Sequence, residues 1–164
     1  MTVFQLALVL AAFLCSLVAG FLFAFAAVVM PGIGRLDDGD FIRAFQVIDG
    51  VIQRSQPLFV LVWVGSVLAI VAAGVLGMRE LDGTEQLLMI AAGLIYLLCV
   101  QLPTDTINIP LNNGLQRLNP GTMDETTRRR ERERFEPRWN WWNVFRTACA
   151  SVASIVLMLL LVRA

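Results

Sequence analysis

Four long apolar blocks alternate with polar segments along the sequence, near residues 3–30, 57–78, 86–102 and 138–162. A helix needs roughly 20 apolar residues to cross a hydrocarbon core of about 30 Å, and each block approaches or exceeds that length. None of the blocks contains aspartate or glutamate. The pattern predicts an all-α fold, a four-transmembrane-helix bundle that forms one membrane domain over residues 1–164.

Two segments between the blocks have helical periodicity but are too polar to span a membrane. The apolar residues of the first segment, 38–54, recur at steps of four, three and four: Phe41, Phe45, Ile48 and Ile52. This single stripe predicts an amphipathic helix after span one, lying against the bundle mouth or the membrane surface. The second segment, 123–136, pairs glutamate with arginine at i,i+4 spacing. It predicts a polar, solvent-exposed helix before span four.

The segment PTDTINIPLNN, residues 103–113, directly follows span three. Proline lacks the backbone N–H that a helix interior requires, so Pro103 is expected to end span three. The residues behind it are then expected to form a non-helical elbow rich in amide side chains. Non-helical backbone at membrane depth is tolerated only where it is buried in protein or lines a cavity. The elbow is therefore expected to fold under the bundle and to meet another span.

Arg146, about two turns into span four, is the expected partner of this elbow. A charge in that position is costly unless it faces the bundle and has a partner. Trp139, Asn143 and Arg146 recur at steps of four and three, and Trp142 lies four residues before Arg146. The spacing predicts that they share one helix face. It also predicts that Arg146 hydrogen-bonds to Asn143 or to the elbow, where Asp105 is the nearest acidic residue.

Two interpretations of this polar group stay open at the level of the sequence. In the first, the elbow and span four form a structural clasp. In the second, they line a ligand pocket that Trp139 and Trp142 wall, with the amides of Asn108 and Asn112 and the guanidinium of Arg146 as polar contacts. Tryptophan near a membrane end also serves as an interfacial anchor, which favours the first interpretation.

The composition excludes several classes of partner and functional site. The chain has no net charge and all 13 of its basic residues are arginine, so bulk charge indicates no nucleic-acid partner. It contains no histidine, which excludes the usual histidine-ligated metal and haem sites and removes the commonest general base. The three cysteines lie in separate spans, without a C-x-x-C pair. We therefore expect no metal and no cofactor, and membrane lipid around the spans.

Three stretches together resemble the anthrone-oxygenase-like membrane family: AGFLFAFAAVVMPGIGRLDDGDFIRAFQVID, PLNNGL and WNWWNVFRT. They extend from span one to span four. The resemblance implies a four-helix membrane bundle and, as in characterised members, oxidation of polyketide anthrones to anthraquinones by molecular oxygen. The residues that match recurrent family positions are Gln46, Pro110, Asn112, Trp142, Asn143 and Arg146. Asp49 stands where an asparagine is expected from the family pattern.

Two functions from different classes follow. The first is a cofactor-independent oxygenase for a lipophilic, anthrone-like aromatic, in which Asn143 and Arg146 hold an enolate oxygen and Asp105 or Asp49 accepts a proton. The expected substrate contacts are Gln46, Asp49, Asn108, Asn112, Trp139 and Trp142. The second is a non-catalytic accessory protein or lipid-binding scaffold of the membrane. A homo-oligomer is compatible with either function.

The distribution of arginine predicts the orientation in the membrane. The connections after spans one and three contain these arginines: Arg35, Arg43, Arg54, Arg117, Arg128, Arg129, Arg130, Arg132, Arg134 and Arg138. The opposite side has only Arg79 and Arg163. The positive-inside rule therefore predicts that loops one and three are cytoplasmic and that both termini lie on the other side.

Cysteine labelling tests this orientation. In intact cells, a membrane-impermeant maleimide is expected not to label a Gly121→Cys variant, because loop three is predicted to be cytoplasmic. Permeabilisation should expose the same thiol. An Asp82→Cys variant, on the predicted outer side, serves as the matched control and should react without permeabilisation. The reverse pattern would invert the topology.

Overall fold

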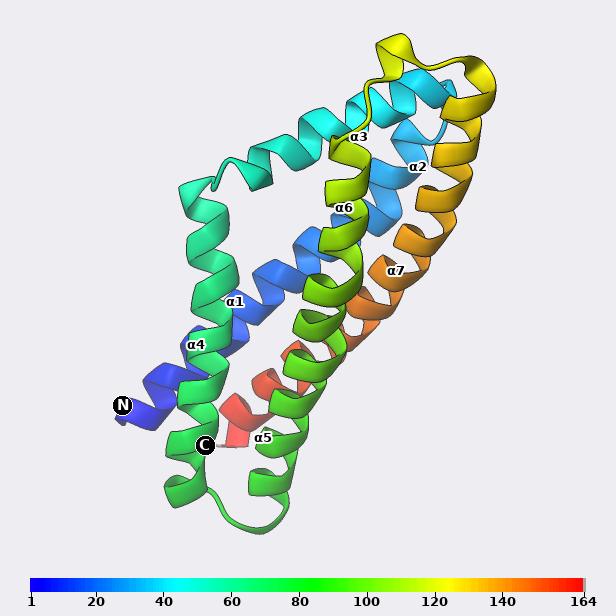
Figure 1. The fold of residues 1–164 in the computed structure, drawn as a ribbon. Coiled ribbons are helices and arrows are strands. Elements are labelled where there is room, and N and C mark those ends of the chain that lie inside the picture. The colour runs from blue at the N-terminus through cyan, green and yellow to red at the C-terminus, as the bar shows by residue number, and fades with distance from the viewer. Residues whose placement is uncertain (164) are drawn as a thin grey trace.

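The computed structural model describes residues 1–163 and consists of helices joined by short turns, with no strand in that range (Figure 1). The first span comprises α1 (Val3–Ala24), η1 (Phe25–Val29), a π-helix of about one turn and therefore called a π-turn, and α2 (Met30–Ile33). It is followed by α3 (Asp38–Gln53) and then by α4 (Pro57–Glu80). The third span comprises α5 (Gly83–Tyr96), the π-turns η2 (Leu97–Gln101) and η3 (Thr104–Asn108), and α6 (Ile109–Gln116). A short turn, η4 (Pro120–Thr122), leads to α7 (Glu125–Arg163). The predicted all-α architecture is confirmed.

Four of the helical segments are long and apolar enough to cross a membrane: Val3–Ile33, Pro57–Glu80, Gly83–Gln116 and Glu125–Arg163. Each also leaves large apolar side chains exposed, among them Phe13, Leu68, Leu98 and Ile155. In water such apolar surface would be unfavourable, whereas lipid tails cover it at no cost. The chain is therefore a multi-pass integral membrane protein.

The first span is the centre of the bundle, because it packs against both α4 and α7, while α5 packs on α7. Both termini and the α4–α5 turn lie at one end of the bundle, whereas α3 and the α6–α7 connection lie at the other (Figure 1). At the α3 end, Phe41 and Phe45 of α3 pack edge-on against Phe135 of α7. This confirms the amphipathic helix, and it shows that the helix closes the mouth of the bundle.

The third span contradicts the prediction that Pro103 ends a helix. It continues through Pro103 and Pro110 to Gln116, so the expected non-helical elbow does not exist. The physical reason lies in the π-turns. In all three π-turns of the structure the last residue stands two positions before a proline, at Pro31, Pro103 and Pro110. A wider turn moves the preceding carbonyls away from the proline ring, which removes the clash that normally breaks a helix.

The polar segment before span four is also not a separate helix. It forms the first part of α7, which runs unbroken past Pro137. A proline inside a helix costs about 3 kcal/mol, but packing on both sides of Pro137 offsets that cost. Phe135 lies 4.6 Å from the ring of Phe45, and Trp139 lies 5.6 Å from the ring of Phe25.

Arg132, on this polar part of α7, links it to the connection between α2 and α3. Its guanidinium donates to the backbone oxygens of Gly34 (2.7 Å) and Leu36 (2.9 Å) and pairs with Asp38 and Glu136. It also lies 4.4 Å from the ring centre of Phe41. Only 16% of the side chain is exposed. Arg132 is therefore a structural residue that holds α3 over the bundle.

Replacing this arginine tests its role in the fold. An Arg132→Met variant in detergent is expected to lose about 2–4 kcal/mol of stability, because it leaves partly buried carbonyls and carboxylates without hydrogen-bond partners. The matched control is Arg129→Met. The Arg129–Glu133 pair has 73% and 63% of its side chains exposed, so its loss should cost at most about 0.5 kcal/mol. Equal melting temperatures for the two variants would contradict the assignment.

Candidate functional site

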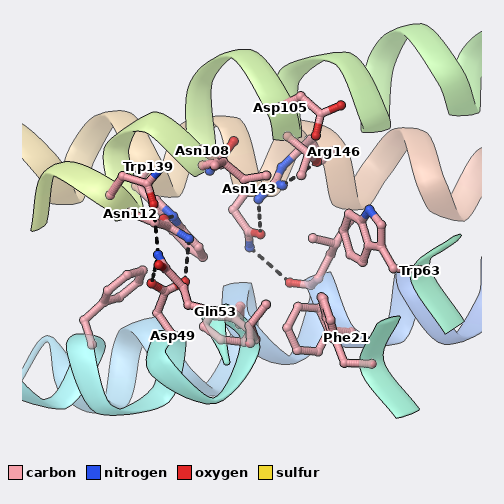
Figure 2. A pocket seen from close by; sticks show the side chains of 18 residues that line it. Phe21, Asp49, Gln53, Trp63, Asp105, Asn108, Asn112, Trp139, Asn143 and Arg146 are labelled. Atoms are coloured by element: carbon pink, nitrogen blue, oxygen red, sulfur yellow. Dashed lines mark hydrogen bonds between the residues drawn. The ribbon is translucent and has the colours of Figure 1, made fainter. Parts of the chain in front are cut away.

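A cavity of about 390 Å³ lies beneath α3, between the start of α4, the third span, α7 and the first span. Its walls are largely aromatic, formed by Phe21, Phe25, Phe45, Phe59, Trp63 and Trp139. Phe59 and Trp63 stack with their ring centres 5.3 Å apart, and Phe21 meets both rings edge-on. Figure 2 shows the polar residues of the cavity in two groups, one around Arg146 and one around Asp49.

The cavity lies at the level of one membrane interface. Arg146 is about 26 Å along α7 from Arg163, at 1.5 Å per residue, and Pro57 begins α4 only two residues before Phe59. A hydrocarbon core is about 30 Å thick. By these lengths the cavity is expected near the head-group boundary at the α3 end of the bundle.

Arg146 is the centre of the first polar group. It is 3% exposed and donates through one terminal nitrogen to Thr104 Oγ1 (2.7 Å) and through the other to Asn143 Oδ1 (3.1 Å). Thr104 in turn donates to the Val100 carbonyl, and the Asn143 amide donates to the Leu22 carbonyl (3.0 Å). The predicted contact between Arg146 and Asn143 is confirmed. The Arg146 Nε–H is buried, and no described residue accepts from it.

Asp49 is the centre of the second polar group. Its carboxylate is 3% exposed and accepts from the amides of Asn112 (2.8 Å), Gln116 (2.8 Å) and Gln53 (2.9 Å). Asn112 Oδ1 accepts from the Trp139 indole N–H at 2.7 Å. Within residues 1–163, Asp49 makes no ion pair. The cavity thus holds a buried anion and a buried cation that are each held by neutral groups.

The sequence suggested that Asp105 is the acidic partner of Arg146, but the structure does not pair them. It lines the cavity but is an exposed residue, and it forms no ion pair with Arg146. Because the helix continues through Pro103, Thr104 faces Arg146 and the next residue turns away from it by about 100°. Asn108, Asn112 and Trp139 do line the cavity.

Two residues expected at the site lie elsewhere. Gln46 donates to the carbonyls of Leu115 (2.8 Å) and Leu118 (3.0 Å), where it satisfies the C-terminal end of α6. Trp142 packs edge-on against Trp141, with ring centres 4.7 Å apart, and does not line the cavity. It is therefore part of a partly exposed aromatic group beside the site, the position expected of an interfacial anchor.

The sequence patterns did not indicate several residues that line the cavity or bond to its charged groups. Thr104, Gln53 and Gln116 supply hydrogen bonds to the two charged groups, and Trp63 supplies a wall. Their local signals are weak, since Gln116 follows the segment predicted to be an elbow and Trp63 is one of only two aromatic residues in span two. The i,i+4 spacing of Phe59 and Trp63 does indicate an aromatic face on that helix.

The arrangement suits a flat, weakly acidic aromatic molecule. The rings supply stacking surfaces, Arg146 supplies a positive donor for a developing oxyanion, and Asp49 supplies a proton acceptor within the same cavity. Among residues 1–163, no group of three or more histidine, cysteine, aspartate or glutamate side chains is placed to hold a metal ion.

An Arg146→Met variant tests whether this cation is a clasp or a functional group. We expect the melting temperature in detergent to stay the same or to rise, because the variant no longer buries a cation that lacks an anionic partner. Thr104 and Asn143 keep their bonds to Val100 and Leu22. The same substitution at Arg132 should destabilise the protein. A clear loss of stability at Arg146 would instead identify a structural clasp.

Comparison with known proteins identifies the family. The family described as anthrone oxygenase matches residues 46–156, about two thirds of the chain. The match begins inside α3, ends inside α7 and contains both polar groups of the cavity. Searches of curated proteins and of solved structures give no match. This chain therefore belongs to the anthrone oxygenase family.

Proposed function

We propose that the protein is a membrane-bound, cofactor-independent oxygenase that acts on a lipophilic, anthrone-like aromatic with molecular oxygen. One observation carries the proposal: Arg146 and Asp49, each buried, line the same aromatic-walled cavity (Figure 2). Its volume of about 390 Å³ is within the roughly 300–1,000 Å³ range of small-molecule sites. Membership of the anthrone oxygenase family supports the substrate class.

The reaction needs little more than these groups. An anthrone has a CH₂ group conjugated to a ring carbonyl, so loss of one C–H proton leaves an enolate. In this proposal the Arg146 guanidinium and the Asn143 amide, which bond to each other, both donate to the enolate oxygen and stabilise the charge that develops there. The electron-rich enolate carbon then forms a bond to one oxygen atom of O₂, which is reduced to a peroxide anion. The anion takes up the proton and becomes a hydroperoxide. Loss of the remaining hydrogen of that carbon and cleavage of the O–O bond release water and leave the quinone carbonyl. One substrate and one O₂ give one quinone and one water.

Asp49 is the proposed base. Its Oδ1 accepts one hydrogen bond, from Asn112, so a carboxylate lone pair is still available on that oxygen. Three amide donors and burial hold the group in one orientation. Asp105, the other acidic residue of the cavity, is exposed and carries no such restraint. The bond from Trp139 to Asn112 also couples the base to an aromatic wall of the site.

The position of the cavity suits a substrate delivered by the membrane. Lipophilic phenols and ketones concentrate at the head-group boundary, where aromatic side chains also gather. The exposed residues Asp105 and Ile109 of the third span border the cavity. The arginine distribution supports a cytoplasmic location for this end of the bundle, so substrate is proposed to enter at the cytoplasmic leaflet.

Oxygen uptake by the purified protein in detergent tests this proposal. With anthrone as substrate, the wild type should consume O₂ and form anthraquinone in equal amounts, faster than protein-free micelles. We expect Arg146→Met to lower kcat/KM by about 10²–10³-fold, the usual cost of removing an oxyanion donor. Asp49→Asn should lower kcat by about 10²–10⁴-fold, because it removes the base.

Two controls and one alternative complete the test. Asp105→Asn and Trp142→Phe should each keep most of the activity, since neither changes the proposed donor or base. If Asp105→Asn loses activity while Asp49→Asn keeps it, the exposed residue Asp105 is the base. If the wild type does not accelerate oxidation and acyl lipid co-purifies in the cavity, the non-catalytic lipid-binding scaffold is the better function.

A further inference from the structure

Asn108 differs from every other amide side chain that lines the cavity. Its residue is 2% exposed, and neither its Nδ2 nor its Oδ1 has a hydrogen-bond partner among the described residues. The other four amides are all engaged. Gln53 and Asn112 donate to Asp49, Asn113 accepts from Gln53, and Asn143 donates to the Leu22 carbonyl.

A buried amide with no partner is unfavourable in a folded protein. Each unsatisfied donor or acceptor lowers the stability of the folded state, whereas an apolar side chain of the same shape would avoid that cost. The helix itself does not require an asparagine here, because asparagine is a poor helix former. A polar ligand in the cavity would supply the hydrogen bonds that this buried asparagine lacks.

We propose that Asn108 is the specificity-determining residue of this cavity, and that its amide pairs with a ligand edge on which a hydroxyl stands next to a ring carbonyl. The hydroxyl donates to Oδ1, and the carbonyl oxygen accepts from Nδ2–H. A side-chain amide offers this donor–acceptor pair in one plane. Neither an acyl chain nor an unsubstituted ring edge satisfies it. The inference rests on the proposed function only for the identity of the ring system.

The position of Asn108 also orients the ligand. Asn108 is four residues after Thr104 in the third span, and Thr104 bonds to Arg146. Arg146 lines the same cavity, and its buried Nε–H has no partner among the described residues. The oxygen-bearing edge of the ligand is thus held at the wall that the third span and α7 form. Its apolar rings then lie among the aromatic residues of the first span and α4, such as Phe21 and Trp63.

Ligand binding without oxygen separates this inference from catalysis. The probes are 1-hydroxyanthrone and its methyl ether, 1-methoxyanthrone, titrated anaerobically against the tryptophan fluorescence of the protein in detergent, since Trp63 and Trp139 line the cavity. We expect the wild type to bind the hydroxy compound about 10–100-fold more tightly, because the ether leaves Oδ1 unpaired.

The variants identify the residue responsible. Asn108→Leu should remove the preference by weakening binding of the hydroxy compound, while its melting temperature equals or exceeds that of the wild type. Asn108→Ser retains a single hydroxyl and should give an intermediate ratio, which keeps the test informative if the leucine variant folds poorly. The matched control is Asn140→Leu, because Asn140 is a partly buried asparagine on α7 that lies outside this cavity, and this variant should keep the wild-type ratio.

The outcomes separate the two proposals. Equal affinity of the wild type for both probes, or an unchanged preference in Asn108→Leu, would overturn the role of Asn108, even if the protein oxidises anthrone. Selective binding that depends on Asn108, without oxygen uptake, would support the recognition edge and reject the oxygenase.

Discussion

The burial of the Arg146 cation inside the bundle is the constraint around which the polar contacts of the cavity are arranged. A guanidinium at this depth requires polar partners from protein, and it obtains them from Thr104 of the third span and Asn143 of its own helix. Asn143 in turn bonds to the Leu22 carbonyl of the first span. One charged side chain thus joins three of the four spans at the level of the cavity, and neutral groups rather than a carboxylate hold it.

The contact between Thr104 and Arg146 depends on the third span staying helical through Pro103, and the positions of Asn108 and Asn112 depend on the helix that continues to Pro110 and beyond. The π-turns η2 and η3 make this possible, since each relieves the clash of the proline that follows it. The polar wall of the cavity is consequently a helix and not a loop. Rigid elements hold functional groups more accurately than loops do, so Thr104, Asn108 and Asn112 form a preorganised surface.

The negative charge of the cavity, the Asp49 carboxylate, is positioned by a different set of contacts. Asp49 belongs to α3, which crosses the mouth of the bundle and is held there by Arg132 and by the aromatic contacts of Phe41 and Phe45. The amides of Asn112 and Gln116 then fix its carboxylate. The anion and the cation sit on separately anchored elements and form no ion pair with each other, so the cavity is lined by both charges.

The sequence by itself determined the four spans, the amphipathic helix after span one and the pairing of Arg146 with Asn143, because each of these depends on spacing within one helix. Tertiary structure alone decided that Thr104, and not Asp105, meets Arg146, that Asp49 is buried and that Trp142 packs outside the cavity. The physical reason is that periodicity sets relative directions along one helix but not which face meets a neighbour. Each π-turn adds about one residue to a turn and so rotates every later side chain by about 100°, a change of register that depends on packing around the prolines.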